Sequence, residues 1–130
     1  MNIKEVAQKY DLTADTLRYY EKVGLIPKVN RNEVGYRDFT EEDTNWVEFA
    51  KCMRNAGMSI EALSEYVALF QKGDSTIAQR KKILLDQQAI MAEKLKDMQA
   101  TYDRLTKKVD NYDNHIAKFE EEKLENIEHA

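Results

Sequence analysis

The sequence is short of cysteine, proline and glycine. Its 130 residues include one Cys, one Pro and four Gly. One cysteine excludes an intramolecular disulfide and any metal site made of several thiolates from one chain, so we expect no metal or cofactor and a reducing, cytoplasmic setting. No run of about eighteen apolar residues occurs, and the opening MNIKEVAQKY carries charges where a signal peptide is apolar. We therefore expect no membrane association and no secretion by that route.

The charge is unevenly distributed. The net charge of −4 argues against a simple polycation that binds nucleic acid. Residues 16–37 nevertheless contain five basic residues and two acids, a local charge of +3, whereas residues 120–130 contain five acids and one lysine. Such a chain can hold a polyanion in one orientation while the rest of its surface repels it.

The turn-forming residues divide the chain. Every glycine and the proline lie within residues 1–73, and the last 57 residues contain neither. We therefore predict a frequently turning domain at 1–73, one long helix at 74–119 and an acidic tail at 120–130.

A helix-turn-helix is expected at the start of the chain. Ile3, Val6 and Ala7 have helical spacing, and Thr13 is a suitable N-cap for a second helix that runs to residue 23. Gly24 stands where a glycine ends a helix. Two short helices separated by about three residues are typical of this motif.

The rest of the first part predicts a hairpin and two more helices. Residues 28–39 place a polar turn between two short stretches that contain Val29 and Tyr36. This pattern favours a small β-hairpin, or wing. Thr40 and Ser59 are expected caps of the two helices that follow. The apolar stripe of the first of these helices is expected at Trp46, Phe49, Ala50 and Met53.

The predicted long helix carries a heptad seam. Its apolar positions are spaced by three and four, without a break from Met91 onward, although Lys81 and Gln88 weaken its start. A helix from Ile77 to Phe119 would be about 65 Å long, too long to be covered by a small domain. It needs a partner, most simply a second copy of the chain. The members of the seam are Ile77, Leu84, Met91, Leu95, Met98, Tyr102, Leu105, Val109, Tyr112, Ile116 and Phe119.

The helix of residues 13–23 has two faces. Ala14, Leu17 and Tyr20 are expected to point inward, whereas Arg18 and Lys22 point outward together with Asp15 and Tyr19. Arginine and lysine neutralise phosphates, and tyrosine hydroxyls help to fix register on a nucleic-acid backbone. An ordinary solvated face, with acidic neighbours as ion-pair partners, is the alternative.

A family resemblance rests on three motifs in combination: TLRYYEKVGL, a wing that ends in GYRDF, and AGMSIEAL in a second helix-turn-helix. Over about the first 70 residues the chain resembles the DNA-binding domain of the MerR family of bacterial transcription regulators. The resemblance implies a mainly α fold, a winged helix-turn-helix followed by a long helix that dimerises as an antiparallel coiled coil.

The resemblance also implies a partner and a set of contacts. A homodimer would bind an inverted repeat in double-stranded promoter DNA and activate RNA polymerase at the same promoter by bending and untwisting the DNA. The implied DNA contacts are Thr13, Thr16, Arg18, Tyr19, Tyr20 and Lys22 on the recognition helix, and Arg31, Tyr36 and Arg37 on the wing.

The effector is less constrained. No cysteine follows the predicted long helix and eleven residues follow Phe119, so we expect neither the cysteine site of metal-sensing relatives nor the large ligand domain of drug-sensing ones. The chain resembles a small branch that responds to aldehydes and other electrophiles through a lone cysteine, here Cys52. Two alternatives stay open: Cys52 is a small buried hydrophobe in a regulator with a non-covalent effector, or the chain is a coiled-coil module that binds protein. We expect no enzyme, because no base stands near Cys52 in the sequence.

Overall fold

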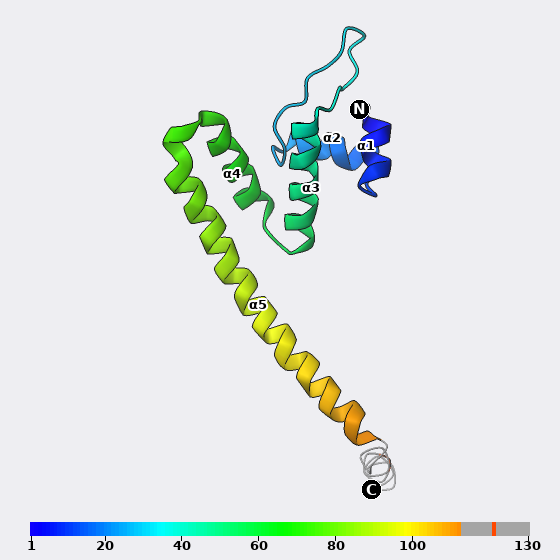
Figure 1. The fold of residues 1–130 in the computed structure, drawn as a ribbon, viewed down its shortest axis with the longest axis vertical. Coiled ribbons are helices and arrows are strands. Elements are labelled where there is room, and N and C mark those ends of the chain that lie inside the picture. The colour runs from blue at the N-terminus through cyan, green and yellow to red at the C-terminus, as the bar shows by residue number, and fades with distance from the viewer. Residues whose placement is uncertain (113–120, 122–130) are drawn as a thin grey trace, which may run out of the picture. The chain divides into compact units, whose positions relative to one another are not determined.

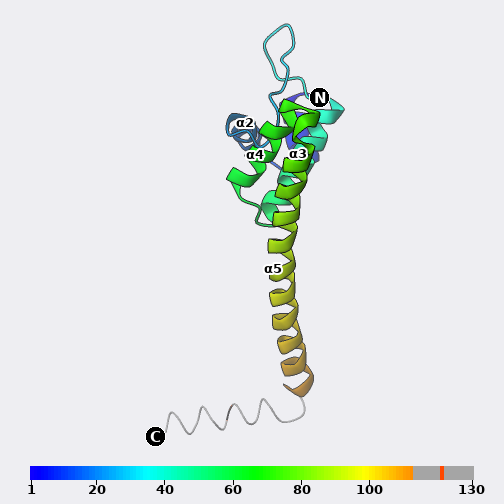
Figure 2. The ribbon, with the colours of Figure 1, turned by 90° about the vertical axis from the view of Figure 1, so that its left-hand side faces the viewer.

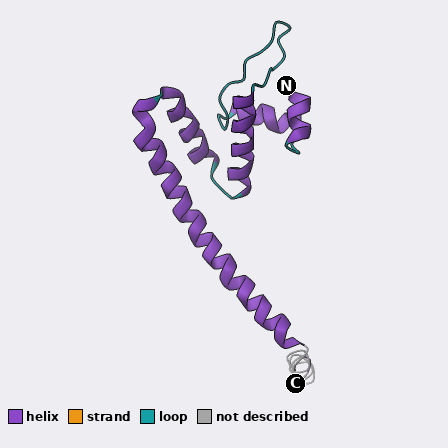
Figure 3. Cartoon of the chain, in the orientation of Figure 1, coloured by secondary structure: helices purple, strands orange, loops and turns teal. Residues whose placement is uncertain are grey.

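The computed structural model describes residues 1–112 and 121, and these residues are mainly helical. Two compact units divide the chain, Met1–Gln88 and Ala89–Ala130. No helix among the described residues is long and apolar enough to cross a membrane. In chain order the elements are α1 (Ile3–Lys9), α2 (Ala14–Lys22), α3 (Glu41–Asn55), α4 (Ile60–Lys72), the 3-10 helix η1 (Asp74–Thr76) and α5 (Ile77–Asn111) (Figures 1 and 3).

The helices begin at the caps that the sequence predicts. The hydroxyl of Thr13 accepts a hydrogen bond from the backbone of α2, and those of Thr40 and Ser59 do the same for α3 and α4. Asp43 completes a capping box on α3 by accepting from the backbone N–H of Thr40 at 2.9 Å. Gly24 follows α2 with a φ of +81°, a conformation that glycine adopts without strain. The predicted starts of α2, α3 and α4 are confirmed.

The core of the first unit lies among α1–α4 and the segment after α2. The apolar stripe predicted for α3 is wrong in part, because Val47 faces the core while Trp46 and Phe49 are only half-buried. Small side chains on the inner face, Thr44, Val47 and Ala50, let α3 lie close to its neighbours. The largest fully buried side chains are Leu17, Leu25, Met58, Leu63, Val6, Val29, Val47 and Val67.

The wing is a long loop rather than a regular hairpin. One antiparallel bridge joins Arg31 and Arg37, and no longer strand forms among the described residues. The side-chain oxygen of Asn32 accepts from the backbone N–H groups of Val34 and Tyr36, at 3.0 Å each, and so shapes the tip. Figures 1 and 2 show this loop extending away from α2 and α3. The predicted chain reversal is confirmed, but the wing forms one bridge and a few backbone hydrogen bonds, such as those from Asn32 N–H to the Tyr36 carbonyl and from Asp38 N–H to the Asn30 carbonyl, in place of a regular ladder.

Most heptad side chains of α5 are exposed, whereas Met91 is half-buried. The helix begins at Ile77, as predicted, and has no buried residue. The expected end at Phe119 lies outside the described residues, as does the tail except for Glu121. The exposed seam of the second unit consists of Leu95, Met98, Tyr102, Leu105, Val109 and Tyr112.

Candidate nucleic-acid interface

Helix α2 has the two faces that the sequence predicts. Leu17 is fully buried and Tyr20 is 7% exposed, whereas Arg18, Tyr19 and Lys22 are exposed. Burial raises the pKa of the Tyr20 phenol, although the nearby charge of Arg54 acts in the opposite direction. The structure therefore places Tyr20 inward, as the sequence predicts.

The start of α2 carries a small polar cluster. The hydroxyl groups of Thr13 and Thr16 lie 2.8 Å apart, and Thr13 also caps the helix. One guanidinium nitrogen of Arg18 lies 2.8 Å from a carboxylate oxygen of Asp15. Both of these charged side chains are largely exposed, and such surface pairs contribute little stability. Arg18 can therefore exchange this partner for a phosphate.

The carboxylate of Glu21 joins α2 to the wing. It accepts a hydrogen bond from the backbone N–H of Val29 at 2.6 Å and another from Nε of Arg37 at 2.8 Å. Burial, the largest single influence, acts to raise the pKa of the Glu21 carboxyl, but the bonds from Val29 and Arg37 and the charges of Arg37 and Arg31 together outweigh it, so this pKa is lowered. The ion pair is largely shielded from solvent.

A hollow of about 390 Å³ lies between the wing and α2, and we call it the wing hollow. It brings together Arg18, Arg31, Tyr36 and Arg37 of the predicted contacts. Arg31 donates to the carbonyl of Gly35 at 2.8 Å, so its charge has a neutral partner. Because Arg37 is already paired with Glu21, the guanidinium groups of Arg18 and Arg31 are the ones that can offer charge and hydrogen bonds to a phosphate here. The complete lining is Asn2, Ile3, Arg18, Arg31, Asn32, Tyr36 and Arg37.

Some residues that line or support the wing hollow were not predicted from the sequence. Asn2 and Ile3 reach the hollow because the backbone nitrogen of Met1 donates to the carbonyl of Phe39 at 2.8 Å and its carbonyl accepts from the Phe39 N–H at 2.8 Å. The sequence suggests Glu21 as an ion-pair partner for the bases of its own helix, whereas the structure pairs it with Arg37 of the wing. The predicted contacts Tyr19 and Lys22 lie on α2 but do not line the hollow.

Cys52 is exposed near the end of α3. It lines a second hollow, of about 400 Å³, together with Tyr10 and Asp11 from the turn between α1 and α2. The ammonium group of Lys51 donates to the carbonyl of Tyr10, which ties this turn to α3. The exposure argues against Cys52 as a small buried hydrophobe. No group of three metal-binding side chains occurs among the residues searched, which are those that the structure describes.

The family follows from comparison with known proteins. The family described as MerR HTH family regulatory protein matches residues 1–69, and the family described as MerR, DNA binding matches residues 45–108. The first match alone includes more than half of the chain. The chain therefore belongs to the MerR family, and the fold class predicted from the sequence is confirmed in its helix-turn-helix and its long C-terminal helix.

Among curated relatives, the HTH-type transcriptional regulator AdhR of Bacillus subtilis is 59% identical over 93 residues, which cover 72% of this chain and 66% of AdhR. An uncharacterized HTH-type transcriptional regulator of Haemophilus influenzae is 37% identical over 64% of this chain and 62% of its own length. The matches thus span less than two thirds of either relative.

Two solved structures resemble the whole described fold. A MerR family transcriptional regulator from Listeria monocytogenes has a TM-score of 0.87 and 46% identity, and the match covers 100% of this chain and 99% of that one. HiNmlR, described as a MerR family regulator that lacks the sensor domain and is bound to promoter DNA, has a TM-score of 0.79 and 31% identity, with 89% and 92% covered.

Replacing Glu21 by Gln is expected to lower the free energy of unfolding at neutral pH by about 2 kcal/mol, because a charged acceptor of two hydrogen bonds is lost. Since the folded-state pKa of Glu21 is lowered, its stabilisation is complete above the pKa that the carboxyl has in the unfolded chain and is lost as the pH falls through the folded-state value. Urea unfolding at several pH values measures both effects.

The matched control is Glu33→Gln at the exposed wing tip, which should leave the unfolding free energy within about 0.5 kcal/mol of the unmodified chain. A stability difference between the Glu21→Gln variant and the unmodified chain that persists unchanged to a pH of about 3 would contradict this assignment of the ion pair.

Proposed function

We propose that this chain is a transcription regulator that binds an inverted repeat within a promoter as a homodimer. The observation that carries the proposal is the wing hollow, in which Arg18 of α2 and two arginines of the wing surround one space. A helix in the major groove and a wing on the adjacent backbone place their cations next to phosphates in this way. The related structure described as bound to promoter DNA supports the same function.

The proposed contacts fall into two groups. The exposed face of α2 enters the major groove, where Thr16, Tyr19 and Lys22 contact DNA directly, whereas the largely buried Tyr20 contributes little contact area. Arg18 and Arg31 hold phosphates from the wing hollow. The complete set is Thr13, Thr16, Arg18, Tyr19, Tyr20, Lys22, Arg31, Tyr36 and Arg37.

Arg18→Ala is expected to weaken binding to the promoter DNA upstream of the chain's own gene and to flatten the plot of log affinity against log salt by about one unit, because one phosphate contact is lost. Lys82→Ala is the matched control, since Lys82 also forms an exposed ion pair within one helix but lies on α5. Fluorescence anisotropy at several salt concentrations measures both quantities. An unchanged affinity and slope for Arg18→Ala would remove Arg18 from the interface.

The exposed seam of α5 is the proposed dimer interface, with the two helices antiparallel. We divide the chain by role into the DNA-binding domain at 1–73, the dimerisation helix at 74–119 and the acidic tail at 120–130. Two copies related by a two-fold axis would present two α2 helices to the two halves of the repeat, and the bound dimer would bend and untwist the DNA so that RNA polymerase can use the promoter.

Leu105→Glu is expected to convert the dimer to a monomer and to weaken DNA binding by at least about tenfold, because it buries a carboxylate in an apolar seam. Ala100→Glu introduces the same charge on α5 outside the heptad positions and should leave the dimer intact. Sedimentation velocity measures the assembly. A monomeric unmodified chain, or a dimeric Leu105→Glu variant, would contradict the proposed interface.

We propose further that electrophiles such as aldehydes act through Cys52. The Cys52 sulfur adds to the carbonyl carbon of the aldehyde, and the thiol proton passes to the carbonyl oxygen, which gives a hemithioacetal. The adduct would lie in the hollow that α3 shares with the turn between α1 and α2. By displacing Lys51 from the carbonyl of Tyr10, it would shift the helix-turn-helix against α3.

Transcription in vitro from the promoter upstream of the chain's own gene tests this switch, with the unmodified chain and Cys52→Ala, each with and without a small aldehyde. We expect induction by the aldehyde only when the thiol is present. Equal output in all four reactions, with DNA binding retained, would instead assign the chain a non-covalent effector. Absence of DNA binding would favour the protein-binding coiled-coil module.

A further inference from the structure

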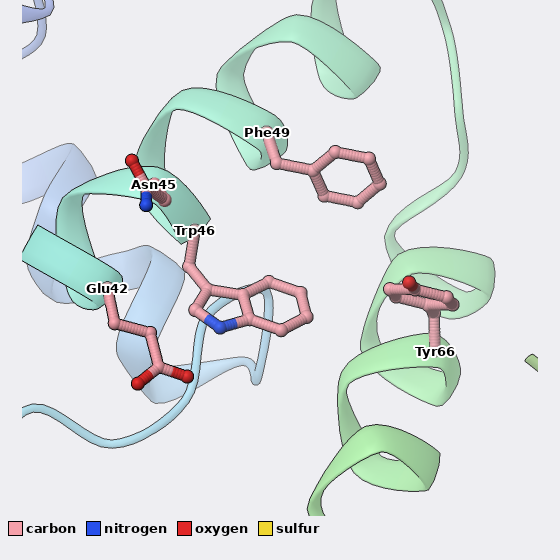
Figure 4. A pocket seen from close by; sticks show the side chains of 5 residues that line it. All are labelled: Glu42, Asn45, Trp46, Phe49 and Tyr66. Carbon is pink, nitrogen blue, oxygen red and sulfur yellow. The ribbon is translucent and has the colours of Figure 1, made fainter. Parts of the chain in front are cut away.

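An aromatic pocket of about 240 Å³ lies between α3 and α4, lined by Glu42, Asn45, Trp46, Phe49 and Tyr66. Figure 4 shows the rings of Trp46 and Phe49 on α3 facing the ring of Tyr66 on α4, with the carboxylate of Glu42 beside Trp46. The ring centroids of Trp46 lie 6.1 Å from Phe49 and 6.0 Å from Tyr66, and those of Phe49 and Tyr66 lie 5.8 Å apart. The three rings thus form one continuous aromatic surface.

The aromatic pocket combines two features that attract a positive charge. The faces of aromatic rings carry negative potential, and an adjacent carboxylate adds a full negative charge. The side chain of Glu42 forms no hydrogen bond or ion pair with any residue in the described part of the chain, and no basic residue lines the pocket. Its carboxylate is therefore available to a bound cation.

The same aromatic cluster already holds a cation on its other side. The guanidinium carbon of Arg80 lies 5.4 Å from the ring centroid of Phe70, and that ring lies 4.9 Å from the ring of Trp46. Arg80 is fixed there by Thr76, whose hydroxyl accepts from its Nε at 3.1 Å. One ring of this cluster thus already binds a cation, and no basic residue lines the pocket beside Glu42.

We propose that the aromatic pocket binds small organic ammonium ions that carry one apolar ring or chain. The volume suits a ligand of about ten heavy atoms, below the usual size of drug pockets. The ammonium group would lie between Glu42 and the ring of Trp46, with the apolar part against Phe49 and Tyr66. Anions are disfavoured, because the first turn of α3 carries Glu41, Glu42 and Asp43.

Trp46 is the only tryptophan of the chain, so its fluorescence reports on the aromatic pocket alone. Titration of the full chain with benzyltrimethylammonium should give a saturable change in emission, with a dissociation constant on the order of 1 mM. Benzyl alcohol and benzoate, which share the ring but lack the positive charge, should bind at least about fivefold more weakly.

Glu42→Gln should weaken binding of the ammonium ion about fivefold and leave the helical content unchanged. Glu41→Gln is the matched control, since Glu41 is an acid of the same helical turn that does not line the pocket. Equal binding of the three probes, or an unchanged affinity in Glu42→Gln, would overturn the proposal. An emission that changes on dilution of the protein but not with the cation would assign the pocket to a second copy, and would overturn it as well.

The pocket would also make the ammonium ion an effector, because a ligand that bridges α3 and α4 alters their packing in the DNA-binding unit. This step rests on the proposed function. Promoter binding with and without benzyltrimethylammonium tests it separately from the fluorescence titration. A fluorescence response to the ammonium ion without promoter binding would contradict the proposed regulator function but support the ammonium site. Promoter binding without a fluorescence response would support the regulator function but contradict the ammonium site.

Discussion

The arrangement of the candidate interface depends on one carboxylate. Val29 is almost fully buried, and its backbone N–H needs an acceptor that the irregular wing does not supply. Glu21 provides that acceptor from α2 and binds Arg37 with its other oxygen. Because the wing has a single β-bridge of its own, this contact fixes where the base of the loop lies relative to α2. The wing hollow exists because that position is fixed.

This contact also divides the charges of the wing hollow into two kinds. Arg37 is neutralised by Glu21 and shielded from solvent, so its main contribution is to position the wing. Arg31 has a neutral carbonyl as its partner, and Arg18 has an exposed carboxylate that water already screens. The charge available to a phosphate therefore comes mainly from Arg18 and Arg31. A rigid base with two adjustable cations suits a polyanion whose local shape varies with sequence.

Local features of the fold could be predicted from the sequence, and tertiary ones could not. Thr13, Thr40 and Ser59 act on helices that begin one residue later, so their roles are visible in the sequence. The ion pair of Glu21 spans sixteen residues and depends on the path of the wing. The buried face of α3 also depends on tertiary packing. Val47 and Trp46 are both apolar, so the sequence alone does not decide which of them is buried. Of the contacts proposed from the family resemblance, Arg18, Arg31, Tyr36 and Arg37 line the wing hollow, whereas Tyr20 is buried.

The exposed seam of α5 connects the fold to the proposed assembly. Six of its apolar side chains, from Leu95 to Tyr112, are between 52% and 71% exposed in a single copy. Burial of one such side chain contributes up to about 1.5 to 3 kcal/mol. Two copies would bury twelve such side chains. Their summed burial free energy outweighs an association cost on the order of 4 to 15 kcal/mol even if each side chain is only partly buried. In the proposed dimer, each copy would present one α2 helix to half of an inverted repeat. The seam that buries the apolar side chains of α5 would therefore also supply the second half of the DNA-binding surface.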